Sequence, residues 1–355
     1  MEYPAFLASE YPQSSPEKAR FHIIPVPLER SVSYGSGTSR GPAALLEASQ
    51  QLEAWDGISA PGTLGFHTQK QVDCSGSIDL IQERISDACR TALQCGAVPV
   101  VLGGEHTVSY GAVRACAEKY DSFGVIHFDA HGDLRDSYEG DSFSHACVLR
   151  RIEDSFNLPL AQFGTRDYCM EELEYRKKRG ILYYDASRLA EEGLPEKPLP
   201  DSFPRRVYIT FDVDGLDSSL MPATGTPSPG GLLWYDVMKL LTRCLKGREV
   251  IGLDVVELAP IPGLSQKAAR RCQNGLIEIK LSGMVPGSEL TPEQHVAGLP
   301  PAHLNGLHEC SGILAGRAPG LLNDTGESWA SINAKIFCQR GHSGRQCVIA
   351  LHAPG

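Results

Sequence analysis

Residues 123–133 read FGVIHFDAHGD, an apolar run that ends in two aspartates and a histidine. A short apolar run of this kind is typical of a strand that is buried on both faces of a sheet. Positions i, i+2 and i+4 of a strand point the same way, so we expect Asp129, His131 and Asp133 to converge if the strand stays extended to its end. This convergence would place a polar site at the end of a buried strand.

Similar apolar runs recur along the chain and alternate with amphipathic stretches of ten or more residues. They predict strands over residues 21–28, 97–104, 123–130, 158–165, 180–186, 206–214 and 249–258. Helical spacing of apolar residues predicts helices over residues 41–55, 77–95, 107–120 and 232–245. This alternation predicts an α/β fold with a mostly parallel sheet covered on both faces. In such sheets, the side chains that do chemistry lie at the carboxyl ends of the strands.

Composition narrows the class of protein. The chain has 355 residues, 42% hydrophobic and 21% charged, which is typical of a globular protein. It contains no long apolar run, and Glu2 and three early prolines interrupt the N-terminus, so we expect neither a membrane span nor a signal peptide. The net charge of −10 argues against a nucleic-acid partner and mildly favours a cationic substrate. We therefore expect a cytoplasmic protein with reduced cysteines, since none of the eleven forms a CxxC pair.

The chain divides into three predicted parts. Residues 1–20 form an N-terminal extension, residues 21–262 form the α/β domain, and residues 263–355 form an atypical C-terminal segment. Gly and Pro become more frequent in this last segment, and no part of it keeps a clear period for long. We expect irregular, poorly ordered structure there, including CQRGHSGRQC at 338–347, with one short strand possible at 277–285.

Three further predicted strands end in side chains of the same kind. His106 lies near the end of VVLGGEHT, Asp212 and Asp214 lie in YITFDVDGLD, and Asp254 and Glu257 lie in IGLDVVELAP. Carboxylates buried side by side repel one another unless a counter-charge neutralises them. A pair of divalent cations is the natural counter-charge. Imidazoles combined with several carboxylates suit Mn(II) better than a thiolate-rich structural zinc site.

Three segments resemble the signatures of the ureohydrolase family, which includes arginase and agmatinase. They are GGEHT at 103–107, FDAHGDLRDSYEG at 128–140 and FDVDGLDSSLMPATGTPSPGG at 211–231. The resemblance spans roughly residues 21–262. It implies a three-layer α/β/α sandwich with a mostly parallel, arginase-like sheet and two Mn(II) ions at the strand ends. It also implies a homo-oligomer, either a trimer or a hexamer.

The resemblance also implies roles for single residues. One manganese would be bound by His106, Asp129, Asp133 and Asp212, and the other by His131, Asp129, Asp212 and Asp214, so that Asp129 and Asp212 bridge the pair. A hydroxide shared by the two ions would attack the guanidinium carbon and release urea and an amine. His145 matches the family's proton shuttle, and Glu257 matches the acid that holds the guanidinium. Asp133 is also a candidate to accept a hydrogen bond from the substrate or the hydroxide.

Other polar residues near these motifs have structural interpretations. We expect His127 to be a hydrogen-bonded core histidine, and Asp254 to support Glu257 rather than to bind metal. The glycine-rich stretch SYGSGTSRGP at 33–42 lacks the strand-GxGxxG-helix order of a phosphate-binding loop. We expect it to border the active site instead.

The residues after the DxHxD motif bear on the substrate. Leu134 and Arg135 stand where arginase-like members present an asparagine and a serine to an amino-acid carboxylate, which argues against arginine. The chain resembles bacterial agmatinase most, which implies hydrolysis of agmatine to putrescine and urea, with Glu139 or Asp141 near the ammonium end. Arg135 keeps open an acidic substrate such as guanidinobutyrate. Guanidinopropionate, arginine and formiminoglutamate also stay open as substrates.

A different class of function is a catalytically silent member that serves as a binding or scaffold subunit. The intact set of six predicted ligands argues against it. In its favour, the family normally closes with an amphipathic helix soon after the DVVEL strand, whereas residues 263–280 break from that pattern. A disrupted reading frame near residue 265 would explain the change, and an uncovered sheet face would reduce stability.

Overall fold

A computed structural model describes residues 3–54, 60–261, 333–341 and 344–352. The chain separates into two units, Met1–Glu289 and Leu290–Gly355. The first unit contains the predicted α/β domain. The strand considered at residues 277–285 lies outside the described residues.

The first unit is built on an eight-stranded sheet in which every described pairing is parallel. The strands are β1 (Phe21–Val26), β2 (Phe66–Thr68), β3 (Val98–Gly103), β4 (Gly124–Phe128), β5 (Leu160–Phe163), β6 (Leu182–Tyr184), β7 (Arg206–Asp212) and β8 (Glu249–Val256). Their order across the sheet is β2-β1-β3-β8-β7-β4-β5-β6. All seven predicted strands are confirmed, and β2 is an eighth that apolar periodicity did not reveal.

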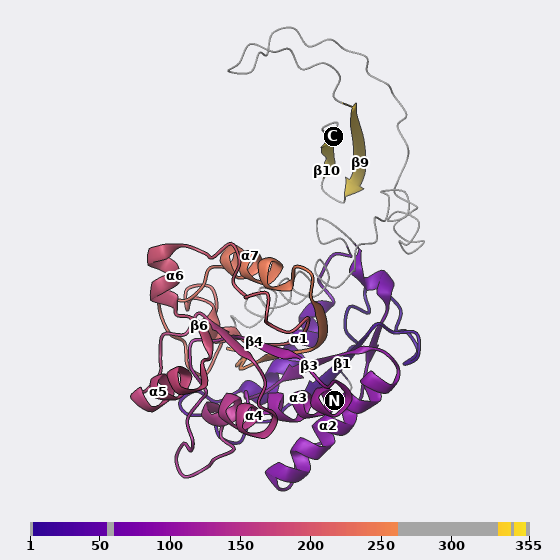
Figure 1. The fold of residues 1–355 in the computed structure, drawn as a ribbon. Coiled ribbons are helices and arrows are strands. Elements are labelled where there is room, and N and C mark those ends of the chain that lie inside the picture. Colours follow the sequence, from indigo (N-terminus) through magenta and orange to yellow (C-terminus); the bar gives the residue numbers. More distant parts are fainter. Residues whose placement is uncertain (1–2, 55–59, 262–332, 342–343, 353–355) are drawn as a thin grey trace, which may run out of the picture. The chain divides into compact units, whose positions relative to one another are not determined.

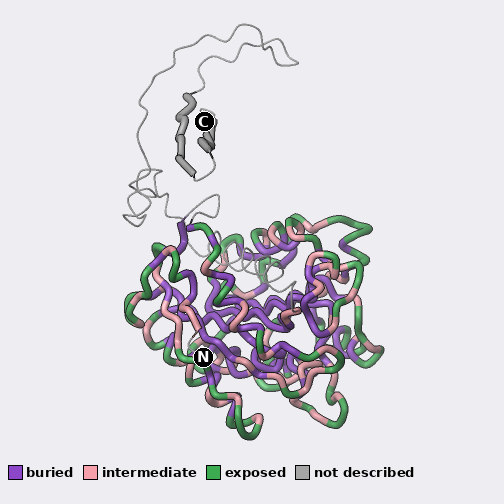
Figure 2. The backbone as a smooth tube through the Cα atoms, turned by 180° about the vertical axis from the view of Figure 1, so that it is seen from behind, coloured by how far each residue is buried: buried purple, intermediate pink, exposed green. Residues whose placement is uncertain are grey.

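Helices cover both faces of this sheet (Figure 1). One face packs on α1 (Gly41–Ser49), α6 (Ala186–Glu192) and α7 (Trp234–Leu245). The other face packs on α2 (Ile78–Gln94), α3 (Val108–Lys119), α4 (Val148–Phe156) and α5 (Met170–Arg179). The strands form the buried layer between them (Figure 2). The three-layer α/β/α sandwich is therefore confirmed.

Local sequence signals explain where several helices begin and end. Ser77 caps α2, because its hydroxyl accepts a hydrogen bond from the Leu80 N–H at 3.4 Å. At the start of α5, Cys169 and Glu172 form a capping box, and Gly180 ends the helix with a φ of 65°. Helices α4, α5 and α6 were not among the predicted elements, although they complete the crossovers between strands.

Two predicted strand ends turn out differently from the extended geometry that we expected. Strand β4 ends at Phe128, so Asp133 does not lie on a continuing strand and instead has a left-handed φ of 53°. Strand β7 ends at Asp212 and runs into a short 3-10 helix, Val213–Gly215, which carries Asp214. The carboxylates gather because the chain turns sharply here, and the period of two along a strand does not extend to them.

Strand β8 ends in a similar way. It stops at Val256, and Glu257 follows with a left-handed φ of 64°. The Glu257 N–H still donates to the Gly104 carbonyl at 2.8 Å, so the turn stays fastened to the end of β3. Left-handed backbone is uncommon for residues with a side chain and is concentrated at functional sites.

The second unit contains an antiparallel hairpin of β9 (Asn333–Gly341) and β10 (Gly344–His352). Its register pairs Gly341 with Gly344 and Cys338 with Cys347. The expectation of irregular structure at residues 338–347 is therefore wrong for the residues described. Two nine-residue strands separated by only two residues are typical of a hairpin. A poorly ordered segment over the rest of residues 263–355 stays a prediction.

Two findings bear on the membrane and redox expectations. Among the described helices, none is both long and apolar enough to cross a membrane. Seven cysteines between residues 74 and 244 are free thiols: Cys74, Cys89, Cys95, Cys116, Cys147, Cys169 and Cys244. This agrees with the expectation of reduced cysteines.

Candidate functional site

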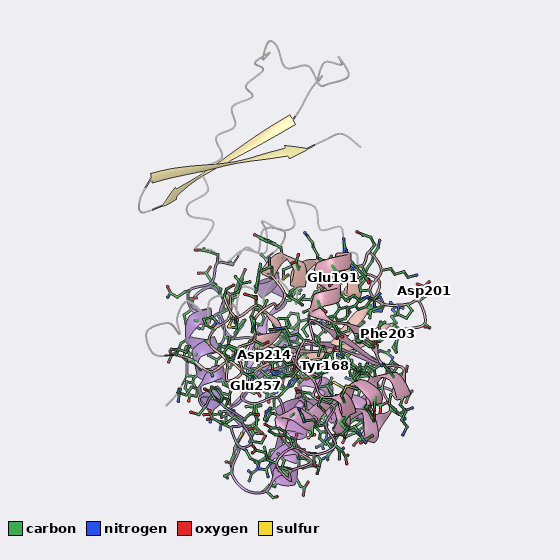
Figure 3. All side chains as sticks on the ribbon, turned by 90° about the vertical axis from the view of Figure 1, so that its left-hand side faces the viewer. Tyr168, Glu191, Asp201, Phe203, Asp214 and Glu257 are labelled. Carbon is green, nitrogen blue, oxygen red and sulfur yellow. The ribbon has the colours of Figure 1, made fainter. Side chains whose placement is uncertain are left out.

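A cavity of about 210 Å³ opens at the carboxyl ends of the central strands. It is lined by Ser33, His131, Asp133, Arg135, Tyr138, His145, Ala146, Asp167, Glu172, Asp212, Thr226 and Glu257. Six of the ten predicted site residues are in this lining. The ends of three neighbouring strands supply them, as expected for a parallel α/β sheet. Asp214 and Glu257, which follow β7 and β8, are labelled in Figure 3.

One side of the cluster centres on His106, which follows β3 and is 1% exposed. Its Nδ1 lies 2.9 Å from Asp133 Oδ2, 3.1 Å from Asp129 Oδ2 and 3.5 Å from Asp212 Oδ2. The ends of β4 and β7 thus bring three carboxylates around one ring nitrogen that follows β3. The structure therefore places His106, Asp129, Asp133 and Asp212 together.

Buried hydroxyl groups fix the orientation of the His106 ring. Its Nε2 lies 2.8 Å from Thr210 Oγ1, and this hydroxyl in turn donates to Asp254 at 2.7 Å. Thr210 Oγ1 must therefore accept from Nε2, which leaves the Nδ1 lone pair facing the carboxylates. Asp254 also accepts from the Tyr208 hydroxyl at 2.7 Å. Asp254 was expected to support Glu257. That expectation is corrected here, because the hydrogen bonds of Asp254 connect it through Thr210 to His106.

The other side of the cluster centres on His131. Its Nδ1 lies 3.1 Å from Asp214 Oδ2 and 3.3 Å from Asp129 Oδ1. Asp214 is held in place because it accepts from the Ala130 N–H at 3.1 Å and from the Thr226 hydroxyl at 3.0 Å. Asp129 faces both imidazoles, one through each carboxylate oxygen.

Burial and neighbouring charges shift the pKa values of Asp212 and His106 in this cluster. Burial, together with the charges of Asp214 and Asp129, raises the pKa of Asp212 well above its ordinary value. Burial alone would lower the pKa of His106, but the close approach of the Asp129, Asp133 and Asp212 carboxylates outweighs it and raises the pKa well above its usual range. Asp212 therefore tends to retain a proton wherever no cation neutralises its charge.

The donor set fits divalent cations. His106 Nδ1 is buried and has no hydrogen-bond partner within the described ranges, although three carboxylate oxygens surround it. A lone pair aimed at carboxylate oxygens is repelled by them unless a cation lies between. Two groups have ligand atoms close enough to share an ion: one contains His106, His127, Asp129 and Asp133, and the other contains Asp129, His131 and Asp214. Imidazole and carboxylate ligands suit Mn(II).

His145, the predicted proton shuttle, begins a 3-10 helix, His145–Cys147, and lines the cavity. Its Nε2 lies 2.9 Å from Ser33 Oγ, and its Nδ1 lies 3.3 Å from Ser31 Oγ. The loop that carries Ser31 and Ser33 is held by the buried Glu105 carboxylate, which accepts from the N–H groups of Arg30 and Ser31 at 2.5 and 2.6 Å. The glycine-rich stretch thus borders the cavity, as expected.

Glu257 lies at the edge of the cluster, is 6% exposed and lines the cavity. Its Oε1 accepts a hydrogen bond from the His106 backbone N–H at 2.7 Å. Burial raises the pKa of Glu257 well above its ordinary value, and the neighbouring charge of Glu105 acts in the same direction. A cation beside this carboxyl would favour its ionised form.

Three residues were proposed for the far end of the substrate, and one of them, Arg135, lines the cavity. Arg135 lines the cavity, with its Nε 3.8 Å from Glu172 Oε2 and its guanidinium over the Tyr138 ring at 5.4 Å. Glu139 is exposed and is not among the lining residues. Asp141 instead pairs with Arg30 at 2.7 Å.

Sequence reasoning missed several of the residues that line the cavity. Asp167 and Glu172 add two acids from the connection after β5 and the start of α5. Glu172 is 2% exposed, and its oxygens accept from the N–H groups of Leu134 and Cys169 at 3.1 and 2.8 Å. Its place three residues after the helix cap was the available signal, because Glu in that position often caps the same turn.

The motif loop at residues 217–231 is closed by Asp217. This carboxylate accepts from the Ser219 N–H and hydroxyl at 3.0 and 2.5 Å, and from the N–H groups of Gly230 and Gly231 at 2.8 and 3.1 Å. The Ser219 hydroxyl makes the largest contribution to lowering the pKa of Asp217 below its ordinary value of 3.8. The loop carries Thr226, which holds Asp214, so Asp217 stabilises the site indirectly.

Asp217→Asn is expected to lower the free energy of unfolding by about 1–2 kcal/mol at pH 7, because the charged acceptor is lost. A carboxylate with a lowered folded-state pKa stabilises the protein above its unfolded-state pKa. The difference from wild type should therefore be constant near neutrality and shrink as the pH falls below about 4. Urea denaturation at several pH values measures it. Ser219→Ala should give a smaller loss, and equal stability of Asp217→Asn and wild type at pH 7 would contradict the argument.

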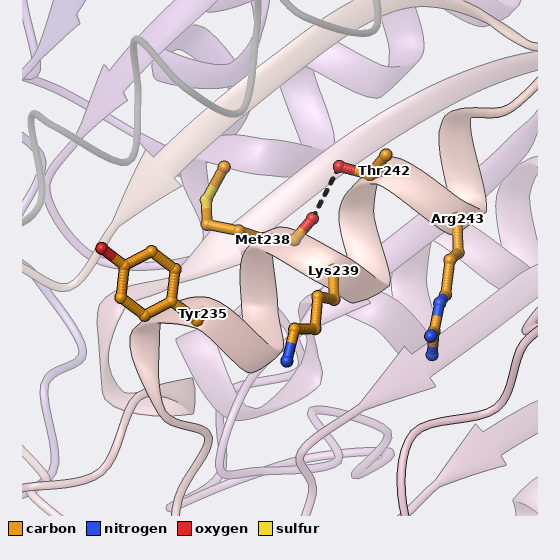
Figure 4. A pocket seen from close by; sticks show the side chains of 5 residues that line it. All are labelled: Tyr235, Met238, Lys239, Thr242 and Arg243. Carbon is orange, nitrogen blue, oxygen red and sulfur yellow. Dashed lines mark hydrogen bonds between the residues drawn. The ribbon is translucent and has the colours of Figure 1, made fainter. Parts of the chain in front are cut away.

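A second hollow, of about 240 Å³, lies on the surface of α7 and is lined by Tyr235, Met238, Lys239, Thr242 and Arg243 (Figure 4). The Thr242 hydroxyl donates to the Met238 carbonyl of its own helix at 2.8 Å. Among the residues that the structure describes, its lining contains no acid and no histidine. Nothing in this hollow resembles the converging polar groups of the strand-end cavity.

Comparisons with known proteins agree with this site. A sequence model of the arginase family matches residues 19–278. The chain is 38% identical to an N(1)-aminopropylagmatine ureohydrolase of Thermus thermophilus, over 69% of this chain and 84% of that protein. It is 32% identical to an agmatinase of Pyrococcus horikoshii, over 70% of this chain and 87% of that protein.

Solved structures agree as well. The agmatine ureohydrolase of Thermoplasma volcanium superposes with a TM-score of 0.68 at 27% identity, covering 79% of this chain and 95% of that one. A hypothetical agmatinase of Burkholderia thailandensis gives a TM-score of 0.66 at 28% identity, covering 79% of this chain and 90% of that one. The match extends over most of the chain and includes each strand end that contributes to the cavity. This chain belongs to the arginase family.

Proposed function

We propose that this hydrolase of guanidino compounds acts on agmatine or a close alkylguanidine, and releases urea and an amine. For agmatine the amine is putrescine. The observation that carries the proposal is the cavity itself, where two imidazoles face four carboxylates and a buried glutamate stands beside them. A binding or scaffold subunit would not require these groups to converge.

The residues divide between two manganese positions as the family resemblance implies. His106, Asp129, Asp133 and Asp212 would hold one ion, and His131, Asp129, Asp212 and Asp214 the other. When bound, the two ions lower the pKa of a water molecule towards neutrality and so supply a nucleophile. The near approach of His106 to Asp129, Asp133 and Asp212 supports the first position, and that of His131 to Asp129 and Asp214 supports the second.

Glu257 and His145 would act on the substrate itself. Glu257 lies beside the cluster with its carboxyl facing the cavity, where it can accept N–H donors of the guanidinium in one plane. His145 lines the cavity from a different loop, and its Nε2 is within hydrogen-bond distance of the Ser33 hydroxyl. It would deliver the proton that the departing amine needs.

The charge of the cavity favours a cationic substrate. Asp133, Asp167, Glu172, Asp212 and Glu257 line it, whereas Arg135 is the one arginine among the described residues of the lining. Arg135 already faces Glu172 and the Tyr138 ring, which leaves it less available to a substrate carboxylate. Relatives are named for agmatine and for N(1)-aminopropylagmatine, and both of these compounds carry a cationic amine end. This supports agmatine-type substrates over guanidinobutyrate.

Urea release tests the proposal directly. Purified protein loaded with Mn(II) is incubated with agmatine, N(1)-aminopropylagmatine, guanidinobutyrate, guanidinopropionate, arginine and formiminoglutamate, and urea is measured by a colorimetric assay. Formiminoglutamate is followed by formamide release. We expect the highest kcat/KM with agmatine or its aminopropyl derivative.

Two outcomes of this panel would contradict the proposal. No urea from either cationic substrate, with manganese bound, would exclude agmatine-type hydrolysis. A preference for guanidinobutyrate would indicate that Arg135 receives a carboxylate.

The trimer or hexamer implied by the resemblance stays a prediction, which light scattering coupled to size-exclusion chromatography would check.

A further inference from the structure

A line of three fully buried side chains lies behind the metal cluster. His127 is on β4, Gln162 is on the neighbouring strand β5, and Arg176 is on α5. All three are 0% exposed. Hydrogen bonds join these side chains one after another to Asp129. Arg176 Nε lies 2.7 Å from Gln162 Oε1, and Gln162 Nε2 lies 2.9 Å from His127 Nδ1. His127 Nε2 then lies 2.8 Å from Asp129 Oδ2.

The direction of each hydrogen bond in this line follows from the chemistry of its groups. Arg176 Nε can only donate, so the Gln162 oxygen faces it. The Gln162 nitrogen also donates to the Gly132 carbonyl at 2.8 Å, which confirms the orientation of the amide. Gln162 Nε2 must therefore donate to His127 Nδ1. The hydrogen of the His127 ring is then on Nε2, and it is donated to Asp129 Oδ2.

This assignment separates His127 from the metal ligands. Its ring nitrogens lie close enough to His106, Asp129 and Asp133 to share an ion with them. However, one nitrogen accepts from Gln162 and the other donates to Asp129, so neither has a lone pair to offer. The expected core histidine is therefore hydrogen-bonded to a predicted ligand.

The same contact restricts the Asp129 carboxylate. Its Oδ2 accepts from His127 Nε2, and its Oδ1 accepts from the His131 N–H at 2.6 Å. A hydrogen bond to each oxygen prevents the carboxylate from rotating freely about its last bond. Asp129 faces both His106 and His131, so its plane decides whether both metal positions can form.

The far end of the line is itself rigid. Arg176 Nη1 donates to Asp185 Oδ1 at 2.9 Å. Its guanidinium lies over two tyrosine rings, 4.9 Å from the Tyr168 centroid and 4.8 Å from the Tyr183 centroid. Tyr168, labelled in Figure 3, belongs to the connection that also contributes Asp167 to the cavity. A buried guanidinium is held so firmly only with such partners.

We propose that Gln162 is a positioning residue for the metal centre and acts through His127, by fixing the ring hydrogen that orients the Asp129 carboxylate. The proposal rests on the proposed function only in taking Asp129 as a metal ligand. Residues that orient ligands from behind affect metal affinity even when they do not touch the metal. A merely structural role in joining β4, β5 and α5 would change stability and leave that affinity unaltered.

A double-mutant cycle on manganese binding tests the proposal. The full chain is prepared as wild type, His127→Phe, Gln162→Met and the double variant, and Mn(II) affinity is measured by isothermal titration calorimetry. We expect His127→Phe to weaken binding by about 10–100-fold and Gln162→Met by about 10-fold. Because Gln162 acts through His127, Gln162→Met should add nothing in the His127→Phe background.

The fold offers a matched control. Gln69 makes the same kind of contact elsewhere, with its Nε2 3.1 Å from Nδ1 of the buried His22 and 3.1 Å from the Ala88 carbonyl. His22 is on β1, and the strands β3, β8 and β7 lie between β1 and β4 in the sheet. Gln69→Met should therefore change stability without changing Mn(II) affinity.

The outcomes distinguish the inference from the proposed function. Additive losses in the cycle, or wild-type affinity in Gln162→Met, would overturn the positioning role. If His127→Phe does not fold, the comparison of Gln162→Met with Gln69→Met carries the test alone. Electron paramagnetic resonance during a Mn(II) titration gives a second readout, because the spin coupling between two Mn(II) ions should appear only at higher Mn(II) concentration in Gln162→Met. Wild-type protein that binds manganese without releasing urea would contradict the proposed function and leave this inference standing.

Discussion

Asp129→Asn is expected to lower kcat/KM for urea release by at least about 1000-fold, which corresponds to about 4 kcal/mol. Asp129 faces both imidazoles of the cluster, with Oδ2 3.1 Å from His106 Nδ1 and Oδ1 3.3 Å from His131 Nδ1. Asparagine keeps the shape of the side chain but offers one oxygen and no charge. Both predicted manganese positions should therefore weaken together. Metal content after dialysis and kinetics at saturating Mn(II) measure the two effects.

The control for this prediction is Asp121→Asn, because Asp121 is exposed in the connection after α3. It removes the same charge far from the cavity and should leave both manganese content and rate unchanged. Circular dichroism checks that both variants are folded. A folded Asp129→Asn protein that keeps two Mn(II) ions and the wild-type rate would show that Asp129 is not a ligand.

Glu257→Gln is expected to lower kcat/KM for agmatine by about 100-fold, or about 3 kcal/mol, while manganese content stays the same. Glutamine retains an oxygen that can accept from the His106 N–H, so the contact at 2.7 Å can persist. The change removes only the negative charge that would face the guanidinium. Because substrate and transition state both carry positive charge, the loss should include a higher KM.

Strand β8 supplies the matched control for this change. Glu249 is the first residue of β8 and is exposed, whereas Glu257 directly follows the other end of the same strand. Glu249→Gln should therefore leave kcat/KM unchanged. If Glu257→Gln hydrolyses agmatine as well as wild type does, the guanidinium must be held elsewhere, and Asp133 would be the next candidate.

The parallel sheet and the positions of its polar strand ends could be expected from the sequence, because they depend on apolar periodicity. Apolar runs located β4, β7 and β8, and a parallel sheet necessarily brings their carboxyl ends to one edge. The short strand β2, Phe66–Thr68, was missed because it has three residues and, among the described strands, pairs with β1 alone. A run of that length carries too few apolar positions to show a period.

The geometry within the site depended on backbone turns that residue type does not specify. Asp133 and Asp214 reach the cluster from a left-handed residue and a 3-10 turn, so strand periodicity predicted their convergence for an incorrect reason. The role of Asp254 was misplaced for a related reason. Its partner Thr210 lies on the neighbouring strand β7, and only the register between β7 and β8 brings the two together.

The left-handed residues Asp133 and Glu257 have a consequence for protein engineering. Glycine adopts their φ values of 53° and 64° without steric cost, whereas other residues do so at the expense of folding stability. A screen for thermal tolerance alone would therefore tend to select glycine at both positions. Such variants would survive heating better and would have lost a predicted manganese ligand or the predicted guanidinium contact. Selection on this scaffold must accordingly score turnover together with heat resistance.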